Sequence, residues 1–186
     1  NTNGSKFPEH AEKIWKHFKL IEIAFSIDDV NERFEYQRAN AIWEEVNTNM
    51  DRFEAMRDRN TNIQLQVCST VNVFNVMYLE GLANWIDKRS FDFVYWNMLH
   101  EARYHSVSTL PESAKEVAIK NLKNANVTEY HRNEFNNIID FIKAGTSLDG
   151  EDLRNNVKLV DWRRQQDLRT HHLELANAID YKGPSI

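Results

Sequence analysis

The chain is poor in the residues that form disulfides, thiolate metal sites and tight turns. Its 186 residues include one cysteine (Cys68), five glycines and three prolines. A single thiol cannot close an intramolecular disulfide or complete a thiolate cage, and its presence favours a reducing compartment. We therefore expect a cytoplasmic protein, and we assign no metal ligands to this chain.

Long apolar runs and an excess of positive charge are also missing. No apolar stretch approaches the roughly 18 residues of a membrane span, and no signal-peptide pattern opens the sequence. The formal net charge of −5 argues against nucleic-acid binding through a broad positive field. We therefore expect neither a membrane nor a nucleic acid among the partners.

The first half of the chain alternates between helical and strand patterns. Apolar and polar residues alternate, as in strands, over 19–26, 62–71 and 91–98. Apolar residues recur at helical spacing over 8–18, 41–58 and 75–87, whereas 27–40 is polar and irregular with at most a short helical turn. This order predicts parallel βαβ units, whose ligands gather at the carboxyl ends of the strands.

The pattern changes near residue 105, after which the sequence predicts only helices. We expect these helices at 111–124, 128–144, 149–168 and 171–180. The predicted fold is therefore α/β, with a half-barrel-like part over 1–105 and an α-helical appendage over 106–186. Three strands cannot close a barrel, so we expect a truncated domain or one that a partner completes.

Polar motifs follow the expected strands in a particular order. They are Thr2-Asn3-Gly4, then Ser26-Ile27-Asp28 with Arg38, then Thr70-Val71 with Asn75, and then Leu99-His100. Further along come Ser108 to Pro111 with Lys115, the stretch Val160 to Arg164, and His172 to Leu175. In order and spacing the whole set resembles the radical S-adenosylmethionine (SAM) superfamily, in its branch with SPASM or twitch C-terminal domains.

The resemblance implies the C-terminal half of a partial (β/α)6 barrel and a SAM site at its strand ends. By this resemblance Ser26 contacts the ribose or amino-acid part of SAM, and Asp28 belongs to the same pocket. Arg38 holds the SAM carboxylate, which suits the planar fork of a guanidinium. By the same resemblance Leu99 lies near adenine, and Asn3 and Asn75 shape the rim of the pocket.

Each of these residues also has a structural interpretation. Arg38 follows Glu32 and Glu35 and could form a surface ion pair with either. Ser26 and Asp28 could be turn and helix-capping residues. Leu99 could be an ordinary core residue, and Asn3-Gly4 an ordinary turn. The sequence leaves these alternatives open.

The chain departs from the family pattern at two points. The glycine that follows Ser-Ile-Asp in the family is Asp29 here, which favours a different local turn. The family binds a [4Fe-4S] cluster through a Cys-x3-Cys-x2-Cys loop, which a chain with Cys68 alone cannot provide. We expect Cys68 on the buried face of its strand, packing as a small apolar side chain.

The resulting hypothesis is a part of a radical SAM enzyme that is inactive alone. The intact enzyme would carry the cluster on a cysteine-bearing N-terminal half and abstract hydrogen from a substrate, which is often a peptide in this branch. The sequence identifies neither the substrate nor a catalytic residue. The alternatives are a cluster-free module that binds a peptide or protein, and one subunit of a split radical SAM enzyme.

Overall fold

The computed structural model describes residues 1–184, and the chain forms two compact units. Unit 1 contains Asn1–Thr70 and Trp85–Asn97, and unit 2 contains Val71–Asn84 and Met98–Ile186. These units interleave along the chain, whereas the predicted domains 1–105 and 106–186 follow one another. The predicted domain boundary stays a prediction.

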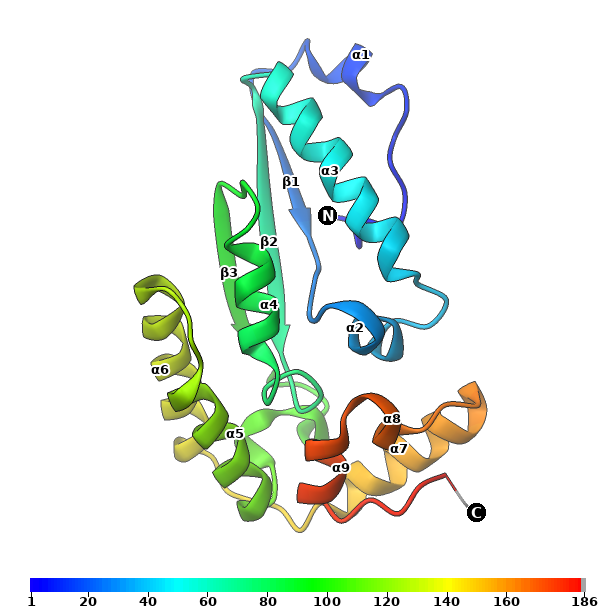
Figure 1. The fold of residues 1–186 in the computed structure, drawn as a ribbon, viewed down its shortest axis with the longest axis vertical. Helices are drawn as coiled ribbons and strands as arrows, with labels where there is room; N and C mark the ends of the chain where they lie inside the picture. The colour runs from blue at the N-terminus through cyan, green and yellow to red at the C-terminus, as the bar shows by residue number, and fades with distance from the viewer. Residues whose placement is uncertain (185–186) are drawn as a thin grey trace. The chain divides into compact units, whose positions relative to one another are not determined.

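Three parallel strands form one sheet (Figure 1). They are β1 (Ile21–Phe25), β2 (Ile63–Val71) and β3 (Phe93–Met98), in the spatial order β1-β2-β3. The register of β1 on β2 runs from Ile21 opposite Ile63 to Phe25 opposite Val67. The predicted α/β class with parallel strands is confirmed.

The segment around Thr2 extends the sheet on the outer side of β1. Thr2 forms a parallel bridge with Phe25. Its N–H donates to the Ala24 carbonyl at 3.0 Å, and its carbonyl accepts from the Ser26 N–H at 2.8 Å. Gly4 follows with a φ of +75°, a conformation that L side chains rarely adopt. The chain therefore turns sharply at the Asn3-Gly4 motif.

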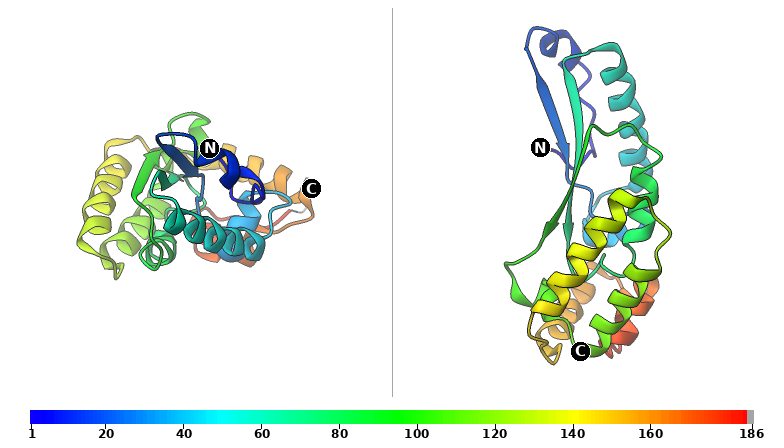
Figure 2. Two further views of the ribbon diagram at one scale, coloured as in Figure 1. Left: turned by 90° about the horizontal axis from the view of Figure 1, so that it is seen from above. Right: turned by 90° about the vertical axis from the view of Figure 1, so that its left-hand side faces the viewer.

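Four helices accompany the strands: α1 (Ala11–Trp15), α2 (Asn31–Gln37), α3 (Trp43–Arg59) and α4 (Leu79–Ile86). The predicted helices 41–58 and 75–87 correspond to α3 and α4. In both views of Figure 2, α3 lies along one side of β1 and β2. The α3 side chains Val46, Met50, Phe53 and Met56 are buried, as their spacing on one helix face requires. They form the core of unit 1 together with the apolar strand residues.

Burial alternates strictly along β2. Ile63, Leu65, Val67, Ser69 and Val71 are buried, and the residues between them are half-buried. Cys68 belongs to the half-buried set, so its predicted place on the buried face is wrong. The physical reason is the period of two in a strand, which puts Cys68 opposite the face that Val67 and Ser69 share. Burial still raises the pKa of the Cys68 thiol.

Two predictions for the first forty residues are corrected. The helix predicted over 8–18 is the single short helix α1, and the Pro8 carbonyl accepts the Ala11 N–H just before it. Ile14 and Phe18 are 59% and 54% exposed, so the apolar spacing there does not mark a buried face. The segment 27–40, expected to be irregular apart from a short helical turn, contains the seven-residue helix α2 with buried Phe34 and Tyr36.

Unit 2 is helical after Met98. Its elements are the 3-10 helices η1 (Arg103–His105) and η2 (Val107–Thr109), followed by α5 (Glu112–Asn124), α6 (Glu129–Ala144), α7 (Glu151–Arg164), α8 (Leu168–His171) and α9 (Leu173–Ala178). The predicted helices 111–124 and 128–144 are confirmed as α5 and α6. The predicted helix 149–168 ends early, because Gln165 adopts a left-handed φ of +53°. The predicted helix 171–180 is interrupted at His172, between α8 and α9.

Among the helices of residues 1–184, none combines the length and the apolar character of a membrane-spanning segment.

The alternation along β2 predicts unequal effects on stability for two neighbouring substitutions. Leu65→Ala should lower the free energy of unfolding by about 2–5 kcal/mol, because it leaves a cavity beneath the sheet. Gln64→Ala should change it by less than about 0.5 kcal/mol, since Gln64 belongs to the half-buried face. Urea unfolding followed by far-ultraviolet circular dichroism measures both values. Equal losses in the two variants would contradict the assigned register.

Candidate functional site

Four of the six predicted site residues lie near the carboxyl end of β1, all in unit 1. Asn3 follows the Thr2 bridge, and Ser26 and Asp28 directly follow β1. Arg38 caps the C-terminal end of α2, the helix that returns from this edge. Parallel pairing brings the carboxyl ends of β1 and β2 to the same edge of the sheet, where α/β proteins commonly bind ligands.

Asp28 connects three segments at this edge. Its Oδ1 accepts the backbone N–H of Thr70, near the end of β2, at 2.8 Å. Its Oδ2 accepts from Arg38 Nη2 at 2.5 Å. The side chains of Asp28 and Arg38 are 15% and 26% exposed, so the pair is largely shielded from water. Arg38 therefore does form an ion pair, but with Asp28 rather than with Glu32 or Glu35.

The Arg38 guanidinium retains hydrogen-bonding capacity. Its Cζ lies 5.6 Å from the centroid of the Phe34 ring, so the ring supports one side of it. Its buried Nε has no hydrogen-bond partner among the described residues. A guanidinium has five N–H donors, and the contact with Asp28 uses one of them. Because Nε is buried, the remaining Nη donors of this 26% exposed side chain could receive a second anion, such as a carboxylate, beside Asp28.

Asp29 occupies the position of the family's glycine and stabilises the start of α2. Its Oδ1 accepts the Val30 N–H at 2.8 Å and the Arg33 Nε–H at 3.1 Å. Gln37 Nε2 donates to the other oxygen at 3.3 Å. Asp29 itself does not have a positive φ, whereas Asn31 does, at +55°. The backbone therefore does not require glycine at position 29.

Burial dominates the titration of Asp29. The residue is 1% exposed, and burial raises the pKa of its carboxyl group to about 7. The Arg33 charge and the hydrogen bonds from Val30 and Arg33 favour the ionised form but offset only part of that cost. Asp29 can therefore change its protonation state near neutral pH, next to Asp28.

The other two predicted residues, Asn75 and Leu99, belong to unit 2. Asn75 is buried, and its Oδ1 accepts the Asn72 N–H at 2.9 Å in the turn that follows β2. The Leu99 N–H donates to the Val71 carbonyl at 3.1 Å, directly after β3. Leu99 is half-buried rather than an enclosed core residue. Asn75 and Leu99 therefore belong to a different unit from Ser26 and Arg38.

The half-buried face of the sheet was given no role by the sequence motifs, although Thr70 belongs to one of them. Along β2 this face carries Gln64, Gln66, Cys68 and Thr70, and Gln66 Nε2 donates to Glu22 Oε1 on β1 at 2.9 Å. Parallel sheets are usually buried on both faces, so a polar, half-exposed face is unusual. The alternation of polar residues in the sequence was the signal that could have revealed it.

The described residues do not fit an iron–sulfur cluster. Cluster binding requires several thiolates, and the chain has Cys68 alone. Within residues 1–184, no group of three or more His, Cys, Asp or Glu side chains is placed to hold a metal ion.

No family model, curated protein or solved structure matches the chain. The interpretation of the site consequently depends on its own geometry: an α/β fold with an aspartate–arginine pair at the carboxyl edge of a parallel sheet.

The raised pKa of Asp29 predicts that stability falls as the pH rises. The contribution of Asp29 to the free energy of unfolding is fully present below the ordinary pKa of 3.8 and is lost progressively as the pH rises to about 7. The reason is that unfolding releases a proton in this pH range. The slope is at most about 1.4 kcal/mol per pH unit. Chemical unfolding at pH 5, 6, 7 and 8 measures it.

Asp29→Asn should remove this component, because the amide keeps an acceptor for Val30 without titrating. Asp140→Asn is the matched control, since Asp140 is 80% exposed, and it should leave the pH profile unchanged. Parallel profiles for the wild type and Asp29→Asn would show that Asp29 does not titrate as stated.

Proposed function

We propose that this chain forms one wall of the SAM pocket in a radical SAM enzyme of the SPASM or twitch branch. The observation that carries the proposal is the Asp28–Arg38 pair at the carboxyl edge of a parallel sheet, with guanidinium donors left over. The motif resemblance described above points to the same edge. The partial (β/α)6 barrel remains part of this proposal.

The charged groups of SAM are complementary to the Asp28–Arg38 pair. The amino-acid end of SAM carries a carboxylate and an ammonium group, which are opposite charges a few ångströms apart. Arg38 would receive the carboxylate through charge-assisted hydrogen bonds, and Asp28 would accept from the ammonium group. The Ser26 hydroxyl, one residue beyond β1, is suited to a ribose hydroxyl or to the same ammonium group. Arg38 and Asp28 would then exchange part of their mutual contact for contacts with the ligand.

Reductive cleavage of SAM requires an electron from a [4Fe-4S] cluster. The ligands of that cluster would come from outside residues 1–186, either from a cysteine-bearing N-terminal half or from a separate subunit. The role assigned to this chain is to bind and orient SAM and to present a substrate surface. Alone it should not cleave SAM.

A second candidate function is a cluster-free module that binds a peptide or protein. Phe93 and Tyr95 on β3 favour it, since they are 44% and 45% exposed. Their rings stack with centroids 6.4 Å apart and an interplanar angle of 25°. Exposed aromatic residues on an edge strand are typical of surfaces that a partner covers. A partner that buries this edge without any SAM requirement would favour the second candidate.

The proposed function predicts SAM binding that depends on Arg38. Arg38→Ala should weaken SAM binding by about tenfold or more, because it removes a charge-assisted contact with the carboxylate. Isothermal titration calorimetry with the purified chain measures the affinity. Arg59→Ala is the control, since Arg59 is 58% exposed and pairs with Glu12 in the same unit; its affinity should equal that of the wild type.

A second ligand separates the carboxylate contact from general damage to the pocket. 5′-Methylthioadenosine keeps the adenosine part of SAM and lacks its carboxylate and ammonium groups. It should bind the wild type and Arg38→Ala with the same affinity. If Arg38→Ala leaves SAM binding intact, or weakens both ligands equally, the assignment of Arg38 to the carboxylate is wrong.

The proposal also predicts that iron and sulfide reconstitution of the purified chain gives no stable cluster and no SAM cleavage, because the thiolates are missing. Addition of a cysteine-bearing partner or N-terminal half should be required for 5′-deoxyadenosine formation. A stable cluster with SAM cleavage by the chain alone would refute its assigned dependence on outside cysteines.

A further inference from the structure

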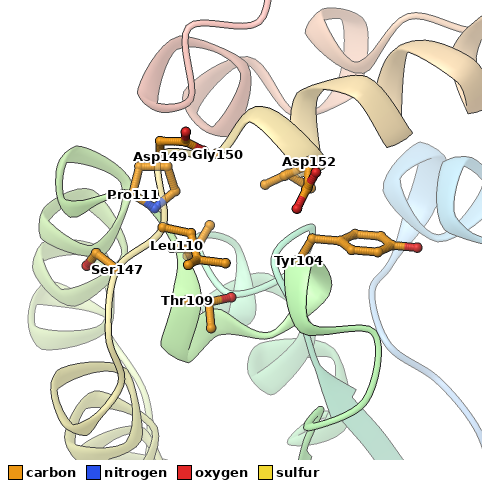
Figure 3. A pocket seen from close by; sticks show the side chains of 10 residues that line it. Tyr104, Thr109, Leu110, Pro111, Ser147, Asp149, Gly150 and Asp152 are labelled. Carbon is orange, nitrogen blue, oxygen red and sulfur yellow. The ribbon is translucent and has the colours of Figure 1, made fainter.

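Unit 2 contains a cavity of about 300 Å³, which is at the lower end of the size range of small-molecule sites. It lies between the η1–η2 segment, the start of α5 and the loop that leads into α7. Figure 3 shows Thr109, Leu110 and Pro111 along one wall and Tyr104 along another. Asp152 extends into the space from the first turn of α7. The motif resemblance assigned no role to Tyr104 or Asp152.

Backbone contacts hold the walls of this cavity in place. The Leu148 N–H donates to the Thr109 carbonyl at 3.0 Å, and Thr109 Oγ1 donates to the Arg103 carbonyl at 2.5 Å. Gly150 has a φ of +80°, and a Cβ there would lie 2.7 Å from Pro111 Cγ. The cavity is therefore formed before any ligand arrives, so a ligand would bind without the cost of ordering these loops.

The lining combines an apolar floor with an aromatic wall. Leu110 and Leu153 are buried, and Leu148 and Pro111 complete the apolar part. The Tyr104 hydroxyl points away from Leu110 (Figure 3), so the tyrosine contributes its ring rather than its hydroxyl to the cavity. An apolar floor suits an aliphatic chain, and an aromatic ring attracts a cation.

The charges that line the cavity are negative. The two ionisable carboxylates in the lining are Asp149 and Asp152, and Asp149 Oδ1 accepts the Glu151 N–H at 2.9 Å. Asp152 makes no hydrogen bond or ion pair with any residue of the described chain. Figure 3 shows its carboxylate directed toward the Tyr104 side chain. Asp152 is exposed, so a ligand here would meet one solvated carboxylate, without a charged partner, next to an aromatic ring.

The neighbouring cations do not neutralise Asp152. Lys115 is buried and donates its Nζ to the Gly145 carbonyl at 2.7 Å. Arg154 Nη1 donates to the carbonyls of Asp149 and Ile179 at 3.0 and 3.2 Å. Neither side chain lines the cavity, so the cavity retains its acidic character.

We propose that this cavity binds an organic cation carried on an aliphatic chain, of the kind that a lysine side chain or a free alkylamine presents. The aliphatic part lies on Leu110, Leu148 and Leu153, and the ammonium group lies between the Tyr104 ring and the Asp152 carboxylate. The inference depends on unit 2 alone and holds whether or not the chain binds SAM.

Nuclear magnetic resonance titration of the full chain with Nα-acetyl-lysine methylamide tests this inference. The probe should shift the amide resonances of Tyr104, Leu148 and Asp152. Nα-acetyl-norleucine methylamide has a similar aliphatic chain without the charge and should bind at least tenfold more weakly. n-Pentylamine distinguishes the sources: equal affinity indicates that a free amine suffices, and weaker binding indicates a peptide-borne lysine.

Asp152→Asn should weaken binding of the lysine probe by about tenfold or more, because it removes the charge that faces the ammonium group. Tyr104→Leu should weaken it several-fold while the apolar floor remains. Asp140→Asn removes an equal charge from an 80% exposed site and should have no effect. Equal binding of the lysine and norleucine probes, unchanged binding in Asp152→Asn, or no binding of either cationic probe would overturn the proposal.

Discussion

The parallel pairing of β1 with β2 is the constraint on which the rest of unit 1 depends. Its register sets which face of each strand meets α3, so Leu65 and Val67 are buried with Met50 and Phe53. The same pairing places the residues after β1 beside the end of β2. Without it, Asp28 would have no Thr70 N–H to accept, and the edge of the sheet would carry no fixed charge pair.

Two adjacent carboxylates at this edge have different physical roles. Asp29 is enclosed and bonded to Val30 and Arg33, so its contribution is to the start of α2. Asp28 is partly exposed and holds Arg38, so its pair can exchange contacts with a charged ligand. Since burial raises the pKa of Asp29 to about 7, the charge beside Asp28 depends on pH near neutrality. The affinity of the Asp28–Arg38 pair for a charged ligand should therefore depend on pH in the same range.

The local spacing of apolar residues predicted helices and strands correctly where the burial of one face decides the structure. The alternation over 62–71 identified β2, and the spacing of Val46, Met50 and Phe53 identified α3, because burial of one face decides both. It misled for Ile14 and Phe18, whose helical spacing has no apolar surface to cover. For Cys68 the alternation itself indicates the half-buried face, and the expectation of a buried thiol departed from that pattern. The end of α7 depends on the left-handed conformation of Gln165, which no propensity indicates.

The sequence by itself determined the class of the fold, the alternation of three strands with α3 and α4 and the lack of thiolates for a cluster, because periodicity and composition are local properties of the chain. It also singled out Ser26, Asp28 and Arg38 as residues near a strand end. The tertiary structure decided that Asp28 is the partner of Arg38, because that pairing depends on how α2 returns to the sheet. It likewise decided that Tyr104 and Asp152 share a cavity, since residues almost fifty positions apart meet there through loop contacts that the sequence does not encode locally.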